Sequence, residues 1–130
     1  MIGGKSDLLP SIESQRQERD EINRNENSYI REKLGAPELL VQLAEEASEL
    51  SHAALKLRRA ITGVNPTPIT KQEALAALQE EIADVDLSIV MLGLEEFDEI
   101  SMMQSKRTRW ANRIRSCAKG GQENGEEEKE

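Results

Sequence analysis

Two pairs of acidic residues at helical spacing carry the clearest chemistry in this sequence. Glu46 and Glu49 lie in the segment LAEEASEL, and Glu81 and Asp84 lie in the segment QEEIADVDLSIVML. Residues three apart lie on one face of an α-helix, so each pair can direct two carboxylates toward one point. A carboxylate beside an apolar surface is costly unless a positive charge compensates it. A hard cation such as Mg²⁺ prefers oxygen ligands, so these residues are candidate metal ligands.

The acidic pairs have to be weighed against the abundance of acidic residues in the chain. Of its 130 residues, 25 are Asp or Glu, so pairs at this spacing also arise by chance, and Glu18 with Glu21 is one. Such pairs usually form a solvated helix face. Here both pairs border apolar stripes on two consecutive predicted helices, which antiparallel packing can bring together. Four converging carboxylates would repel one another unless cations bind, so convergence would favour a metal site.

Helical periodicity dominates the chain, and no alternating strand pattern interrupts it. Breaks are predicted at Gly35, at the segment TGVNPTPI and at Gly93. Thr70 and Glu73 have the spacing of a capping box at the start of a helix. The sequence therefore predicts an all-α fold, a four-helix bundle with helices at about residues 11–34, 37–61, 71–93 and 97–118.

The chain is long enough for one domain with a core of its own. We expect a flexible N-terminus over residues 1–10, a helical domain over residues 11–118 and a disordered acidic tail over residues 119–130. The predicted third helix becomes apolar on nearly all sides over residues 87–92, which is typical of a central helix or a subunit interface. We therefore expect self-association as a dimer or tetramer, with residues 87–94 in or beside the interface.

The net charge and the residue composition argue against several classes of partner and site. A net charge of −8 and a pI of about 4.8 argue against nucleic acid or an anionic membrane as the main partner. No apolar run reaches the roughly 18 residues of a membrane span, and the segment MIGGKSDLL lacks the regions of a signal peptide. One cysteine, Cys117, excludes an intramolecular disulfide, and one histidine argues against structural zinc. A cytoplasmic protein is expected.

The two acidic motifs resemble those of the MazG-like, all-α nucleoside triphosphate pyrophosphohydrolases. The family pattern is Glu-Glu-x-x-Glu on one helix and Glu-x-x-Asp on the next. The segment from Glu45 to Glu49 matches the first half, and Glu81 with Asp84 matches the second. The resemblance covers about residues 34–113. The loop TGVNPTPIT makes the two halves lie further apart in sequence than is usual in the family, which could alter access or substrate choice.

The resemblance implies an enzyme that hydrolyses nucleoside or deoxynucleoside triphosphates to monophosphate and pyrophosphate, in cleansing of the nucleotide pool. It also implies that Glu46, Glu49, Glu81 and Asp84 bind Mg²⁺, for which Mn²⁺ is a possible substitute. Mg²⁺ can neutralise charge on the attacked phosphate and activate a water molecule. We expect Glu45 to be solvated, because it points about 100° away from Glu46 on an ideal helix.

The helix predicted at residues 97–118 carries the basic run KRTRWANRIR in an otherwise acidic protein. Lys106 and Arg109 are candidate residues for binding the triphosphate. Salt bridges to the acidic helices are the alternative for both residues. We expect Trp110 in the core and not beneath a nucleobase.

Two other classes of function remain. Glu49 and His52 have the spacing used by di-iron carboxylate bundles, but such a site needs two of these motifs and the chain has one histidine, so two subunits would have to share the site. A non-catalytic helical interaction module would leave Glu81 and Asp84 beside an apolar surface without a role.

Overall fold

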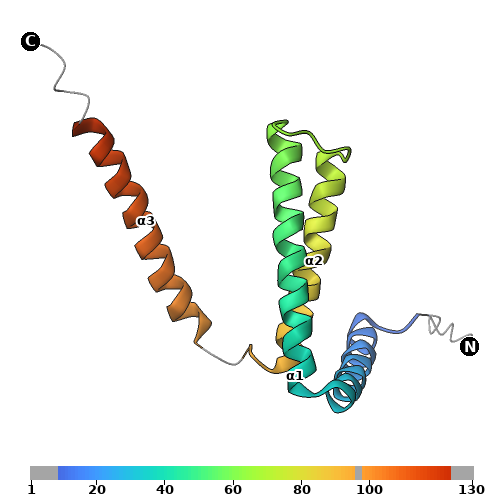
Figure 1. The fold of residues 1–130 in the computed structure, drawn as a ribbon. Coiled ribbons are helices and arrows are strands. Elements are labelled where there is room, and N and C mark those ends of the chain that lie inside the picture. Colours follow the sequence, from blue (N-terminus) through green and yellow to red (C-terminus); the bar gives the residue numbers. More distant parts are fainter. Residues whose placement is uncertain (1–8, 96–97, 124–130) are drawn as a thin grey trace, which may run out of the picture. The chain divides into compact units, whose positions relative to one another are not determined.

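The structure is a computed structural model that describes residues 9–95 and 98–123. It contains three helices, α1 (Ile12–Thr62), α2 (Lys71–Leu92) and α3 (Glu99–Glu123), and no strand is found in the described residues (Figure 1). The all-α prediction is therefore confirmed. The prediction of a four-helix bundle is not confirmed. The helices expected at residues 11–34 and 37–61 are joined across a kink in one element, α1.

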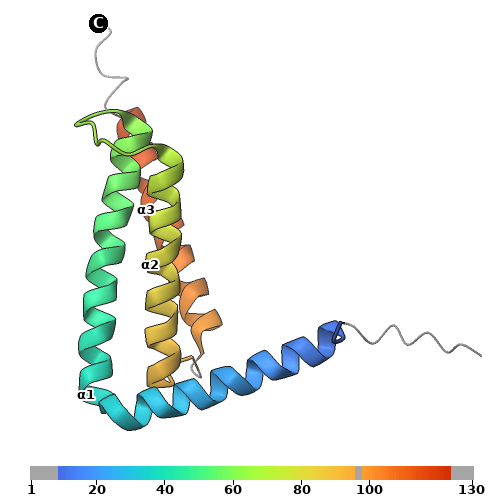
Figure 2. The same cartoon turned by 90° about the vertical axis from the view of Figure 1, so that its right-hand side faces the viewer.

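A kink divides α1 at the glycine where a helix end was predicted. Gly35 has φ 71° and ψ 166°, a non-helical conformation that a residue with a side chain rarely adopts. Pro37 follows in what is effectively a first-turn position, where its missing N–H costs little. The helix resumes at once on the far side, so the predicted break becomes a bend, and the N-terminal arm (residues 12–34) leaves the rest of α1 at an angle (Figure 2).

The remainder of α1, residues 36–62, packs beside α2 to form a helical hairpin. Its buried apolar residues come from both helices: Leu39 and Ala53 from α1, and Ala74 and Met91 from α2. The two alanines lie in the part of the hairpin nearer the connecting loop.

The two ends of α2 agree with the sequence prediction. Thr70 Oγ1 accepts a hydrogen bond from the Glu73 amide at 3.1 Å, and Glu73 Oε2 accepts one from the Thr70 amide at 2.8 Å. The predicted capping box is thus confirmed. At the other end Gly93 has φ 66°, a left-handed conformation that terminates helices.

The apolar side chains of α2 are covered unequally in the single chain. Ser88 and Met91 are 5 % exposed, whereas Leu87 is 51 % and Ile82 is 44 % exposed. Within the first unit, α1 covers one side of α2.

Arg31 ties the N-terminal arm to the end of α2. Its Nε donates to the Met91 carbonyl at 3.0 Å and its Nη2 donates to the Val90 carbonyl at 2.7 Å. The carbonyl groups at the end of a helix carry partial negative charge, so a guanidinium is favourable there. The Val90 carbonyl also accepts a hydrogen bond from the Gly93 amide at 3.0 Å.

The last helix, α3, belongs to a second unit of the chain, residues 95–130. It begins at Glu99 and extends through Gly120 and Gly121 to Glu123, five residues past the predicted end at 118. Trp110, expected in the core, is 64 % exposed on α3. Within the described residues, no helix is both long and apolar enough to cross a membrane. The expectations for residues 1–8 and 124–130 fall outside the described residues.

Candidate metal centre

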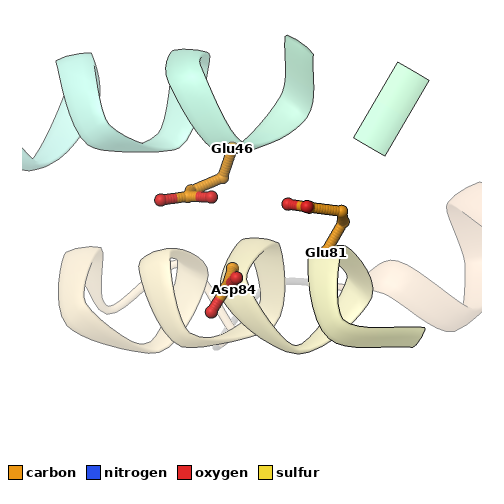
Figure 3. Close-up of side chains that lie close together, drawn as sticks. All are labelled: Glu46, Glu81 and Asp84. Atoms are coloured by element: carbon orange, nitrogen blue, oxygen red, sulfur yellow. The ribbon is translucent and has the colours of Figure 1, made fainter. Parts of the chain in front are cut away.

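Three carboxylates converge where α1 faces α2. Glu46 projects from α1, and Glu81 and Asp84 project from α2 (Figure 3). Each offers an oxygen, and these three oxygens lie within 4.8 Å of one another. All three residues are half-buried. We call Glu46, Glu81 and Asp84 the carboxylate cluster.

The cluster stands in the middle of the face along which the helices pack. Ala74, Glu81 and Ser88 are seven residues apart, which is about two helical turns, so they fall on one line along α2. Asp84 lies seven residues before the buried Met91 and shares this face. Acidic residues therefore occupy positions that an ordinary helix pair would fill with apolar side chains.

Glu81 has the most unfavourable surroundings of the three. Its Oε2 is buried and has no hydrogen-bond partner. The pKa of Glu81 is raised, and loss of hydration is the largest cause. The negative charges of neighbouring carboxylates also raise it, those of Glu49, Asp84, Glu46 and Glu80. A buried carboxylate oxygen without a partner is destabilising, and a bound cation would supply the missing interaction.

Neighbouring polar groups help to position the cluster. The side-chain amide of Gln42, one turn before Glu46 on α1, donates a hydrogen bond to Glu46 Oε1. This contact holds one carboxylate oxygen and leaves Oε2 available. On α2, Ser88 Oγ donates to the Asp84 backbone carbonyl at 2.9 Å, so the buried hydroxyl has a partner and does not compete for the carboxylate.

Glu49, the fourth predicted ligand, does not belong to the cluster. Its side chain is exposed, although its charge is the largest electrostatic contribution to the raised pKa of Glu81. It therefore lies at the rim of the site. Glu45 is exposed, as expected from its direction on the helix.

A cavity of about 230 Å³, called here the side cavity, adjoins the cluster. Glu81 belongs to both, because it also lines the side cavity. The sequence reasoning considered His52 only as an iron ligand and did not single out Lys56. The steps of three and four from Glu49 to His52 to Lys56 would have placed these three residues on one face of the helix. The lining residues are Glu49, His52, Ala53, Lys56, Ile69, Ala74, Ala77 and Glu81.

The predicted triphosphate-binding residues lie elsewhere in the chain. Lys106 and Arg109 are exposed on α3, in the second unit. Their contact with a substrate therefore stays a prediction from the sequence.

The donor set of the cluster fits a hard divalent cation. It consists of carboxylate oxygens alone, which suit Mg²⁺ and Mn²⁺, whereas softer metals prefer histidine or cysteine. Mg²⁺ keeps several waters and binds substrate phosphates, so few protein ligands suffice. A di-iron site of the bundle type would need a second histidine, which the sequence lacks.

Three comparisons, with models of protein families, with curated proteins and with solved structures, find no match for this chain.

Proposed function

We propose that this protein is a Mg²⁺-dependent pyrophosphohydrolase of nucleoside or deoxynucleoside triphosphates. The observation that carries the proposal is the approach of Glu46, Glu81 and Asp84 oxygens to within 4.8 Å, with Glu81 Oε2 buried and unpartnered. The motif resemblance to the MazG-like enzymes supplies the substrate class and the products, monophosphate and pyrophosphate. The role in nucleotide-pool cleansing and the cytoplasmic location are part of the same proposal.

The residues of the chain have distinct tasks in this reaction. Glu46, Glu81 and Asp84 hold the cation through their carboxylate oxygens, and Gln42 keeps Glu46 oriented toward α2. Glu49, exposed at the rim, can turn toward the cation as a fourth ligand, because exposed side chains change rotamer readily. When bound, Mg²⁺ supplies charge neutralisation at the phosphate and a more acidic water. Lys106 and Arg109 are proposed to bind the triphosphate.

The proposal includes self-association. Leu87 and Ile82 are exposed apolar residues on α2, which a second copy can cover. We propose that the protein forms a dimer or a tetramer in which these side chains are covered.

Substitution of one carboxylate of the cluster tests both the metal site and the reaction. Mg²⁺ should raise the melting temperature of wild type. At a hundredfold excess over its dissociation constant, the bound cation adds about 2.7 kcal/mol to the free energy of unfolding. Asp84→Asn should shrink this shift and abolish turnover while far-UV helicity persists. Asp86→Asn is the matched control, because Asp86 lies two residues away on α2, is exposed and is outside the cluster. An equal Mg²⁺ effect in wild type and Asp84→Asn would place the cation elsewhere.

Product analysis decides the reaction type. A panel of nucleoside and deoxynucleoside triphosphates, separated by ion-exchange chromatography after incubation with Mg²⁺, should release monophosphate and pyrophosphate. Glu49→Ala should also abolish turnover, whereas Lys106→Ala should reduce it less, because it removes one phosphate contact and leaves the metal. Release of orthophosphate and diphosphate would refute the assignment. No turnover of any nucleotide would favour the non-catalytic helical interaction module.

A further inference from the structure

One lysine, Lys56, lines the side cavity close to the carboxylate cluster. Lys56 and Glu49 both line the cavity from α1, and Glu81 lines it from α2. Because Glu81 also belongs to the cluster, a ligand in the cavity would lie directly beside a cation held by the cluster.

The apolar residues that the two helices contribute to the side cavity are small. Ala53 and Ala74 are buried at 6 % and 1 % exposure, and Ala77 is half-buried, whereas Ile69, from the loop before α2, is a large apolar residue of the lining. The volume of about 230 Å³ is below the roughly 300–1000 Å³ of pockets that enclose whole drug-sized ligands. This space suits one or two phosphate groups better than a complete nucleotide.

Lys56 is not engaged by the acidic residues around it. Within residues 9–95 and 98–123, the ion pair that forms is Arg16 with Glu13, and Lys56 makes none with Glu49 or Glu81. Its ammonium group has three donors and is available for an anionic ligand. A lysine commonly binds phosphate as a point charge, and a metal-bound polyphosphate would present such oxygens beside the cluster.

We propose that Lys56 binds the pyrophosphate portion of the triphosphate in the side cavity, opposite the cation held by Glu46, Glu81 and Asp84. The inference rests on the proposed function and specifies its substrate site. In hydrolysis, water oxygen bonds to the α-phosphorus, the bond from that phosphorus to the α,β-bridging oxygen breaks, and its electron pair leaves with pyrophosphate. The proton of the water passes to solvent. Lys56 would stabilise the charge that develops on the leaving pyrophosphate.

Binding of inorganic pyrophosphate to the purified full chain in Mg²⁺, measured by calorimetry, tests this assignment. Lys56→Met keeps a long side chain and removes the charge at an exposed position, so the fold should persist. Since a hydrogen bond to a charged group contributes about 1.5–3 kcal/mol, affinity should fall by about tenfold or more. Lys56→Arg should recover part of it. Arg58→Met is the matched control, because Arg58 lies two residues away and lines a different depression.

A thermal shift with Mg²⁺ alone separates this inference from the proposed function. Lys56→Met should keep the full Mg²⁺ shift while losing pyrophosphate affinity, and Arg58→Met should keep both. If the Mg²⁺ shift is present but pyrophosphate binds wild type and Lys56→Met equally, or weakens equally in both variants, the inference is wrong and the metal site stands. The same holds if wild type binds Mg²⁺ without binding pyrophosphate. If wild type shows no Mg²⁺ shift, the proposed function and this inference are both wrong.

Discussion

Glu81 presents its carboxylate at the surface where two helices meet, and this position controls its acidity. Loss of hydration and the neighbouring charges of Glu49, Asp84 and Glu46 raise its pKa above the ordinary value of 4.5. The folded chain therefore binds the Glu81 proton more tightly than the unfolded chain does. Protonation stabilises the folded state at this site, and that stability is lost as pH rises from the unfolded pKa through the folded one.

Glu81→Gln should remove this penalty in the metal-free protein. In EDTA at neutral pH, the variant should have a larger free energy of unfolding than wild type, and the difference should shrink as pH falls through the raised folded-state pKa toward the unfolded value of 4.5. Urea denaturation across this range measures the effect, with Glu45→Gln as a control at an exposed glutamate that does not contribute to the raised pKa of Glu81. With Mg²⁺ present the order should reverse, because the amide is a poorer ligand. A less stable Glu81→Gln protein in EDTA at neutral pH would contradict the account.

At the scale of elements, the N-terminal arm is held by a contact between distant parts of the first unit. The bend at Gly35 turns the arm, and Arg31 then reaches the carbonyls of Val90 and Met91 at the end of α2. The arm buries little apolar surface, since Ile22 and Tyr29 are exposed. The two hydrogen bonds of Arg31 are contacts that hold the arm to the hairpin.

Arg31→Met should loosen the arm. Loss of two charge-assisted hydrogen bonds from a largely exposed side chain should reduce the free energy of unfolding by about 1–2 kcal/mol. Arg24→Met, an exposed substitution on the same arm, should change it by less than about 0.5 kcal/mol. Amide hydrogen exchange should rise in the arm in the first variant and stay unchanged in the second. Equal stability of the two variants would show that the Arg31 contact does not hold the arm.

For the whole molecule, the described helices leave apolar side chains uncovered in both units. Leu87 and Ile82 are exposed on α2, and α3 exposes Ile100, Trp110 and Ile114. Isolated helices are marginal in water unless an apolar face is packed. This is the physical reason to expect association between copies.

Light scattering should give a mass of at least two chains of 14.6 kDa at micromolar concentration. Leu87→Glu should lower the mass toward that of one chain, because it places a charge in the expected interface. Val64→Glu, in the loop between α1 and α2, introduces the same charge at a more exposed position and should leave the mass unchanged. A wild-type mass of one chain would refute the prediction that residues 87–94 lie in or beside an interface.

The sequence alone determined the features that depend on residues three or four apart. Thr70 with Glu73 predicted the start of α2, Gly93 predicted its end, and the spacing of Glu81 and Asp84 predicted that they share a face. These are local properties, since capping bonds and helical periodicity involve neighbouring turns. The predicted break at Gly35 is a non-helical residue and a kink, after which the helix resumes at once. At Gly120 the helix continued, because a glycine weakens a helix without always ending it.

The tertiary structure alone decided which side chains meet across the helices. The rotation and register of α1 against α2 place Glu46 in the cluster and leave Glu49 at its rim, a distinction of less than one helical turn. The same packing leaves Leu87 exposed and places Lys56 in a cavity beside Glu81. A periodicity near 3.6 residues identifies a face but not the height or angle at which the partner helix meets it. Contacts between residues distant in sequence therefore required the folded chain.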